Sequence, residues 1–124
     1  SVLEIGLKEI PDWICCGATP AHNVDELLSL SLSAKNLELA EQVPGDMAVA
    51  CASCFSRLKF AQHILGENET KRKLVEKAID APVHLERNVK HLLEILVRDY
   101  GLDHLAKEVK KPLSGLTVAC YYGC

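Results

Sequence analysis

The sequence feature that most constrains this chain is a set of cysteines in two separated pairs. Cys15 and Cys16 are adjacent and stand directly before Gly17, and Cys51 and Cys54 follow further along at a Cys-x-x-Cys spacing. Four thiols that a fold can bring to one point form a soft ligand set, which favours an iron–sulfur cluster or zinc. The pattern therefore predicts metal or cluster ligation by these four residues.

A disulfide scaffold is the first alternative, because the chain has six cysteines in 124 residues. Such scaffolds are usually shorter and rich in loops, whereas this sequence is rich in long amphipathic patterns. A bond between the adjacent Cys15 and Cys16 would also close a strained ring. Metal ligation is therefore favoured, with structural disulfides or inert buried thiols as the remaining alternatives. A reducing cytoplasm is the expected compartment.

Length and composition narrow the classes of function. The chain has 124 residues, of which 48% are hydrophobic, and we expect one domain over residues 1–124 with a real core. The net charge is −3 and charges of both signs alternate, so no basic surface for nucleic acid is expected. The apolar runs are shorter than the ~20 residues of a membrane span, and no signal peptide is recognised at the start.

Hydrophobic periodicity predicts an α/β fold. Short runs bounded by turn residues predict strands at 2–10, 47–50, 83–85 and 116–119. Helical spacing predicts helices at 24–43, 53–65, 69–79, 88–100 and 102–109, with Asn23 and Ser53 as N-terminal caps. Because strands and helices alternate, we expect three layers, with a mainly parallel sheet of about four strands flanked by helices.

This fold would place both cysteine pairs at one edge of the sheet. The strand at 47–50 would deliver Cys51 at its carboxyl end, where α/β sheets bind cofactors. Cys51 and Cys54 would then lie at a helix start, where the helix dipole lowers thiol pKa values. A metal-free redox pair has the same local pattern and stays an alternative. The adjacent Cys15 and Cys16 suit a single zinc ion poorly, so the geometry favours a polynuclear iron–sulfur cluster over zinc.

Other residues with reactive or aromatic side chains have simpler interpretations. Cys120 is expected to be a small buried residue of the last strand. Trp13 is expected to belong to the core, and Tyr121 and Tyr122 are expected to serve packing. His22 is expected to be solvated rather than a ligand.

The cysteine motifs are similar to those of a known family. The motif Cys-Cys-Gly at 15–17, the motif Cys-Ala-Ser-Cys at 51–54 with Phe55 and Leu58-Lys59 after it, and Tyr122-Gly123-Cys124 together resemble the cysteine-rich CCG domain of the B-type subunit of heterodisulfide reductase. Segments 100–103 and 112–116 extend the resemblance over nearly the whole chain. The resemblance implies that Cys15, Cys16, Cys51 and Cys54 are four of the five cysteines of a first motif and that Cys124 opens a second. The chain is therefore expected to be a fragment of a longer two-motif subunit.

The resemblance also implies a function. In that family the motifs hold noncubane 4Fe-4S clusters that cleave the disulfide of coenzyme M and coenzyme B in methanogenesis, with electrons from partner subunits that carry flavin or ordinary clusters. Related CCG proteins are iron–sulfur subunits of succinate, fumarate, glycolate and lactate oxidoreductases. We thus expect part of an oxidoreductase that acts on sulfur groups or transfers electrons. Because ligands of both motifs are missing, we expect the fragment alone to assemble no complete native cluster and to be inactive. The alternative from another class is a structural or interaction module whose cysteines hold zinc or no metal.

Overall fold

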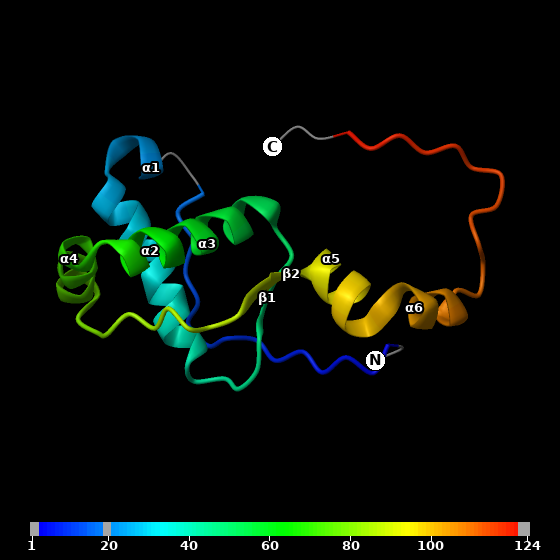
Figure 1. Cartoon of the computed structure of the whole chain (residues 1–124), viewed down its shortest axis with the longest axis horizontal. Helices are drawn as coiled ribbons and strands as arrows, with labels where there is room; N and C mark the ends of the chain where they lie inside the picture. Colours follow the sequence, from blue (N-terminus) through cyan, green and yellow to red (C-terminus); the bar gives the residue numbers. More distant parts are fainter. Residues whose placement is uncertain (1–2, 19–20, 122–124) are drawn as a thin grey trace.

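A computed structural model describes residues 3–18 and 21–121 of the chain. In this part, helices pack on a two-stranded parallel sheet, and helix is the dominant element (Figure 1). The α/β class expected from the sequence is confirmed. The helical segments are α1 (Ala21–Val24), α2 (Glu26–Ala40), α3 (Ala52–Glu67), α4 (Glu69–Ile79), α5 (Leu92–Glu94), η1 (Ile95–Gly101) and α6 (Leu102–Glu108), and the strands are β1 (Met47–Val49) and β2 (Val89–His91).

Helix α2 packs against both α3 and α4. Asp25 precedes it with an extended backbone, and the Asp25 carboxylate accepts a hydrogen bond from a backbone N–H of the first turn. This bond satisfies one of the N–H groups that a helix start leaves open. The observed α2 is shorter at both ends than the helix expected at 24–43. Asp25 caps it instead of Asn23, which lies inside the short helix α1.

The next two helices follow the expected order. Helix α3 is capped at Cys51, not at Ser53, and it continues through Gly66, which was expected to lie beyond its end. The Asn68 side chain then accepts a hydrogen bond from a backbone N–H in the first turn of α4. The expected range of α4 is confirmed at Glu69–Ile79.

Two groups of buried apolar side chains hold these elements together. Burial of one such side chain contributes about 1.5–3 kcal/mol, so these groups are a main source of stability. The first lies where α2, α3 and α4 meet and consists of Leu30, Ala34, Ala61, Leu65, Val75 and Val83. The second joins α2 and α3 to the sheet and consists of Leu37, Val49, Leu58 and Val89.

The sheet has a parallel register with Met47 opposite Val89 and Val49 opposite His91. Strand β1 lies where the sequence predicted a strand. Two predictions are wrong around strand β2. The strand lies at 89–91 instead of 83–85, and it occupies residues that were predicted to form the first turn of a helix at 88–100. Val89 gives the physical reason, since its side chain is only 2% exposed and packs in the second apolar group.

The segment before β2 is extended without strand pairing. The Gln62 side chain of α3 donates hydrogen bonds to the carbonyl oxygens of Leu85 at 2.9 Å and Arg87 at 2.6 Å. A side-chain amide thus binds the carbonyl groups that a neighbouring strand would otherwise engage. The expected strand at 83–85 is therefore replaced by an extended segment anchored to α3.

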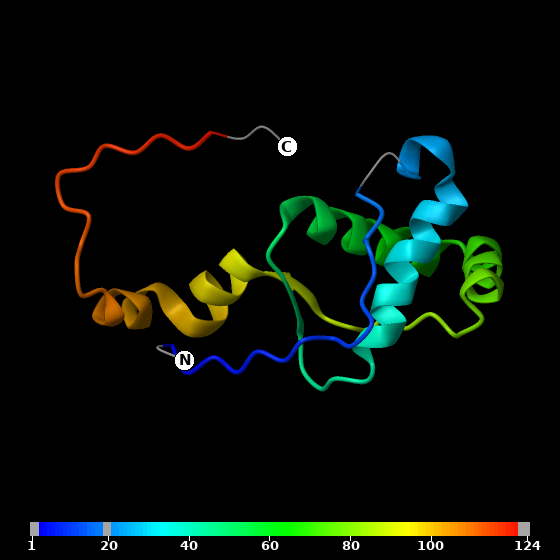
Figure 2. The same ribbon diagram turned by 180° about the vertical axis from the view of Figure 1, so that it is seen from behind.

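The other two expected strands form no ladder within the described residues. The N-terminal segment is extended, and the chain after α6 runs extended and exposed to Tyr121 (Figures 1 and 2). A strand depends on hydrogen-bonded neighbours for its stability. The sheet in the described part of the chain consequently has two strands instead of about four.

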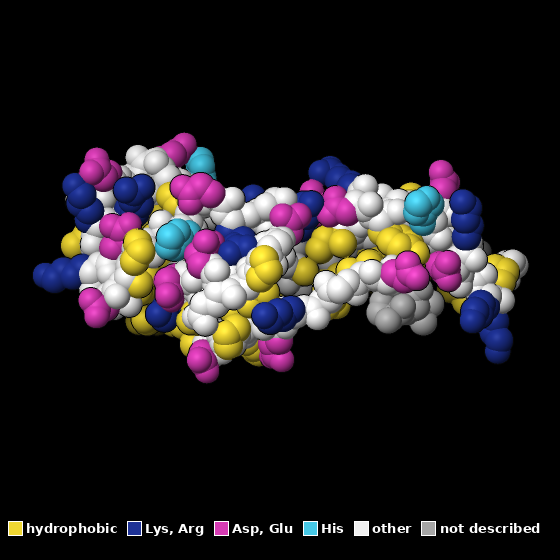
Figure 3. Space-filling view, turned by 90° about the horizontal axis from the view of Figure 1, so that it is seen from below, with side chains coloured by type: hydrophobic (Ala, Val, Ile, Leu, Met, Phe, Trp, Pro, Cys, Tyr) yellow, Lys and Arg dark blue, Asp and Glu magenta, His cyan; other side chains and the backbone are white. Residues whose placement is uncertain are grey.

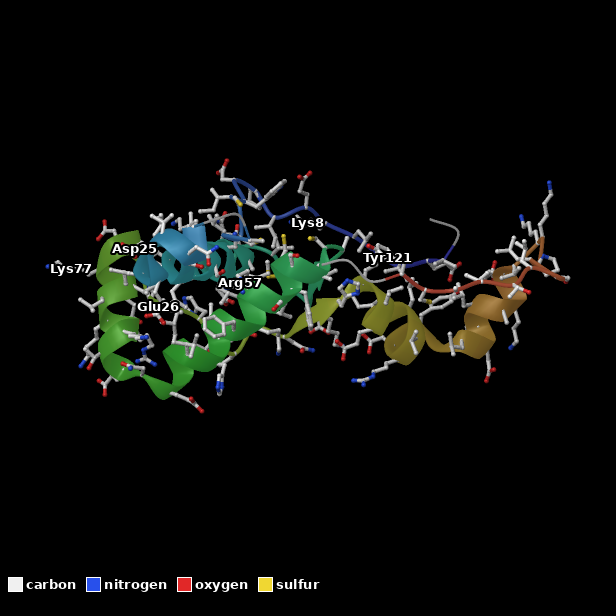
Figure 4. All side chains as sticks on the ribbon, turned by 90° about the horizontal axis from the view of Figure 1, so that it is seen from above. Lys8, Asp25, Glu26, Arg57, Lys77 and Tyr121 are labelled. Atoms are coloured by element: carbon white, nitrogen blue, oxygen red, sulfur yellow. The ribbon has the colours of Figure 1, made fainter. Side chains whose placement is uncertain are left out.

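Charged side chains of both signs are mixed over the face seen in Figure 3. Lys71 of α4 contacts Glu26, the first residue of α2, with 2.8 Å between the ammonium nitrogen and a carboxylate oxygen. Glu26 and its neighbour Asp25 are labelled in Figure 4. Among the described helices, none has the length and apolar character needed to cross a bilayer.

Candidate functional site

The candidate site is a group of thiols between the N-terminal segment and the start of α3. The Sγ atom of Cys16 lies 2.7 Å from that of Cys54, although the two residues are far apart in sequence. Both are free thiols. Sulfur atoms are visible in Figure 4 where the N-terminal segment passes the first turn of α3. The fold thus brings one cysteine of each predicted pair into direct contact.

Cys51 joins this group from the capping position of α3. Hydrogen bonds from the backbone N–H and the thiol of Cys54, and from the backbone of Ser53, lower the pKa of the Cys51 thiol. N–H groups at a helix start stabilise a thiolate in this way. Cys51 is exposed, so its sulfur combines an accessible position with a favoured anionic form.

Cys54 has the opposite character. Its burial, followed by the neighbouring thiols of Cys16 and Cys51, raises the pKa of Cys54 to about 12. A half-buried thiol beside other sulfur groups resists ionisation because a negative charge there is poorly solvated. Without a metal, Cys54 therefore keeps its proton, and its thiol donates a hydrogen bond to Cys51 while it accepts one from Cys16.

The adjacent cysteines of the first pair do not share one environment. Cys16 is 6% exposed and contacts Cys54, whereas Cys15 is exposed. Within residues 3–18 and 21–121, no three Cys, His, Asp or Glu side chains are arranged to hold a metal ion. The donor chemistry nevertheless suits a thiolate-bound group, because the soft sulfur atoms of Cys16 and Cys54 meet from two distant segments and the Cys54 thiol hydrogen-bonds to Cys51.

Helix α2 positions the loop that carries Cys16. The Asn36 side chain accepts a hydrogen bond from the Ile14 N–H and donates one to the Ile14 carbonyl oxygen, both at 2.9 Å. One helical turn earlier, the Ser33 hydroxyl donates to the carbonyl oxygen of Cys16, also at 2.9 Å. Gly17 follows with φ +78°, and a Cβ atom there would lie 3.4 Å from the Ser29 oxygen atoms.

Sequence reasoning missed this role of α2. Ser29, Ser33 and Asn36 are buried, and their spacing places them along one face of the helix. The signal that could have identified them is a buried polar line on an otherwise apolar helix, since buried polar groups require partners. The backbone of the Cys-Cys-Gly loop supplies partners for Ser33 and Asn36.

Three expectations about single residues are wrong. Cys120 is exposed on extended chain, because the strand that was to bury it has no partner in the described residues. Trp13 is 61% exposed, and its Nε1–H donates to Glu9 at 2.9 Å at the surface. The packing role expected for Tyr121 is not seen, since its side chain is 94% exposed. Tyr122, Cys124 and the side chain of His22 lie outside the described part of the chain.

His91 lies closer to the site than its sequence position suggested. It ends β2 opposite Val49, and its ring contacts Phe55 edge-on with centroids 5.8 Å apart. Phe55 follows Cys54 directly in α3. The Nδ1 atom of His91 accepts a hydrogen bond from the Leu93 N–H at 3.2 Å, which starts α5.

The fold and the thiol group define a cysteine-rich α/β domain in which a Cys-Cys-Gly loop meets a helix that starts at Cys-x-x-Cys. Residues 1–59 match the CCG cysteine-rich domain family, so the resemblance recognised from the cysteine motifs is confirmed. Proteins with this domain typically bind iron–sulfur clusters.

The chain is also similar over almost its whole length to subunits of known reductases. It is 38% identical to the 8-methylmenaquinol:fumarate reductase membrane anchor subunit of Wolinella succinogenes, over 99% of this chain and 43% of the relative. It is 34% identical to a protein of Archaeoglobus profundus that is named as similar to the B-type subunit of heterodisulfide reductase, over 98% of this chain and 42% of the relative. It is 27% identical to the B-type subunit of the ferredoxin:CoB-CoM heterodisulfide reductase of Methanosarcina mazei, over 98% of this chain and 42% of the relative. The chain spans less than half the length of each relative.

Proposed function

We propose that this chain is part of a protein similar to the B-type subunit of heterodisulfide reductase and that its thiol group holds an iron–sulfur cluster. The observation that carries the proposal is the 2.7 Å approach of Cys16 and Cys54 inside the region that matches the CCG domain. A bound cluster of the noncubane 4Fe-4S type would supply single electrons for cleaving a thiol disulfide of the coenzyme M–coenzyme B kind, or for electron transfer. The expected compartment is the cytoplasm.

The chain's own residues fill distinct parts of this role. Cys15, Cys16, Cys51 and Cys54 are the proposed ligands, and Cys124 is the proposed ligand of a second motif. Cys51 is prepared for ligation because its pKa is lowered, while Cys54 must release its proton when a metal binds. The burial of Cys16 keeps water away from one side of the thiol group.

A polynuclear cluster suits this ligand set better than a zinc ion. Cys15 and Cys16 are neighbours with different exposure, so they cannot easily turn toward one small ion. Different metal atoms of a larger cluster can accept thiolates that point in different directions. For this reason iron–sulfur ligation is proposed ahead of structural zinc.

Metal analysis tests the proposal. The chain is reconstituted without oxygen in the presence of iron and sulfide, then analysed for both elements and by visible absorption spectroscopy. We expect some bound iron and sulfide with broad visible absorption, in less than the amount of a complete native cluster, and we expect both to be lost in Cys16→Ser and Cys54→Ser. Cys120→Ser is the matched control and should retain both, because Cys120 is an exposed thiol and is not among the proposed ligands. Colourless protein with zinc, or iron retained by both site variants, would overturn the proposal.

The substrate of the whole protein is either a heterodisulfide or an organic acid such as fumarate. The similarity to a fumarate reductase subunit favours a role as the iron–sulfur subunit of a related succinate, fumarate, glycolate or lactate oxidoreductase. In both cases the proposed partners are other subunits that deliver or accept electrons. The complex purified from its source is assayed with the heterodisulfide and with fumarate. Activity with only the heterodisulfide supports the first role, and activity with only fumarate supports the second.

A metal-free redox pair of Cys51 and Cys54 is the remaining candidate. The contrast between a lowered pKa at Cys51 and a raised one at Cys54 is a feature of thiol pairs that exchange disulfides. Thiol titration of metal-free protein before and after reduction tests this role. A reversible loss of two thiols, mapped to these residues with the fold retained, would favour it over cluster ligation.

A further inference from the structure

We propose that Asn36 and Ser33 of α2 are positioning residues that separate the adjacent thiols of Cys15 and Cys16. They fix the backbone on either side of Cys15, so that Cys16 turns into the thiol group and Cys15 stays outside it. The significance for a cluster rests on the proposed function. The positioning itself is a property of the chain without metal.

Asn36 acts on the residue before the pair. Its side chain is 4% exposed, and its amide group exchanges two hydrogen bonds of 2.9 Å with the backbone of Ile14. This exchange uses the same donor and acceptor pairing that a neighbouring β-strand would offer. The amide nitrogen also donates to the carbonyl of Leu32 at 3.2 Å, which fixes the orientation of the side chain on its own helix.

Ser33 acts on the second cysteine. Its side chain is 1% exposed, and its hydroxyl donates to the Cys16 carbonyl oxygen at 2.9 Å. Gly17 then turns the chain with φ +78°, close to Ser29 of the same helix. Ile14, Cys16 and Gly17 are therefore all held against α2, and little freedom remains for exchange between the two cysteine side chains.

This arrangement explains how a vicinal pair can serve a polynuclear group. Two neighbouring thiols that are free to rotate would compete for the same direction, whereas an anchored backbone gives each thiol its own side. The buried polar atoms of Asn36 and Ser33 would lose their partners if the loop moved, which opposes such movement. The helix thus determines which sulfur faces Cys54.

Thiol alkylation of the metal-free, reduced chain tests the positioning directly. Iodoacetamide modification of Cys16 is followed by mass spectrometry of its peptide in the native chain, Asn36→Ala and Ser33→Ala. We expect the rate at Cys16 to rise about tenfold in Asn36→Ala and less in Ser33→Ala, because two bonds are lost in one case and one in the other. The rate at the exposed Cys15 should change little.

Ser31→Ala is the matched control. Ser31 lies on the same helix, and within the described residues its buried hydroxyl has no hydrogen-bond partner. This variant should leave the Cys16 rate unchanged. A second control, Val75→Ala, destabilises the fully buried core at α4 away from the loop. If Val75→Ala raises the Cys16 rate as much as the positioning variants do at equal loss of stability, the effect is general opening and the inference is wrong.

A second readout uses reconstituted protein. The positioning variants should bind iron with an altered visible and electron paramagnetic resonance spectrum, while Ser31→Ala keeps the native spectrum. If native protein binds no iron, the proposed function fails but the alkylation rates still decide the positioning. If Asn36→Ala does not fold, Ser33→Ala carries the test. Unchanged Cys16 alkylation in Ser33→Ala would overturn the inference.

Discussion

The guanidinium group of Arg87 donates a 2.7 Å hydrogen bond to the carbonyl oxygen of Ala40, the last residue of α2. It also donates to the Val43 carbonyl at 3.1 Å and pairs with Glu41 at 3.0 Å. A helix end leaves carbonyl groups without partners, and a planar group with several donors can satisfy more than one of them. Arg87 thereby joins the segment before β2 to the end of α2.

Replacing Arg87 with lysine should destabilise the fold although the charge is kept. The side chain is 11% exposed, and an ammonium group cannot reproduce the directions of the guanidinium donors. We expect a loss of about 1–3 kcal/mol in the free energy of unfolding, measured by urea denaturation. Arg98→Lys is the control, since Arg98 is 76% exposed and pairs only with Glu94 among the described residues. A shift no larger than that of the control would contradict the assigned role.

Local patterns in the sequence were enough to predict several elements. Helical spacing in the charged run at 69–79 predicted α4, and the uncharged run before Cys51 predicted β1 and the helix start that carries Cys51 and Cys54. These predictions depend on neighbours in sequence. The contact of Cys16 with Cys54 depends on how α2 packs between segments that are distant in sequence. Hydrophobic periodicity does not predict such packing.

The wrong predictions have a common physical cause. Val89 has helical spacing with later residues, but its pairing with Met47 and its burial in the second apolar group favour a strand. Asn36 is an ordinary polar residue by its helical position, and only the approach of Ile14 gives it a role. Cys120 was expected to be buried because its strand was expected to find a partner. In each case a tertiary contact decided the outcome.

Gly17→Ala should disturb the cysteine loop. The left-handed backbone at φ +78° is unfavourable for a residue with a Cβ, by about 1–2 kcal/mol, and the new atom would approach Ser29 at 3.4 Å. We expect lower stability in urea denaturation together with faster alkylation of Cys16. Gly6→Ala is a matched control in the same N-terminal segment, where no atom lies within 4 Å of the added Cβ and φ is not positive. Equal behaviour of the two variants would show that Gly17 is not constrained.

The ion pair between Asp46 and Lys90 should make stability depend on acid pH. The hydrogen bond from Lys90, 2.7 Å away, lowers the pKa of the Asp46 carboxyl, and desolvation opposes this effect. A lowered pKa in the folded state contributes stability that is present above the unfolded value of about 3.9 and is lost as pH falls through the folded value.

Asp46→Asn tests this dependence. The variant should be less stable than the native chain at neutral pH, by a modest amount because Asp46 is half-exposed, and the difference should shrink to nothing in strong acid. Urea denaturation midpoints across the acid range provide the measurement. Asp103→Asn is a control at an acidic residue of α6 with no ion pair among the described residues. A difference between native and Asp46→Asn protein that does not vary with pH would refute the prediction.

Cys51 and Cys54 should differ in reactivity when the reduced chain holds no metal. Backbone N–H groups at the start of α3 lower the pKa of Cys51, whereas burial raises the pKa of Cys54 to about 12. The thiolate is the reactive form, so at neutral pH iodoacetamide should modify the exposed Cys51 first.

Peptide mass spectrometry over a pH series gives the modification rates of Cys51 and Cys54. The rate at Cys51 should level off at a lower pH than that of an ordinary thiol, while the rate at Cys54 should still rise at the alkaline end. Ser53→Ala leaves the backbone donors in place and should preserve this order, whereas faster modification of Cys54 at neutral pH would show that the N–H groups of α3 do not act on Cys51 as the structure indicates.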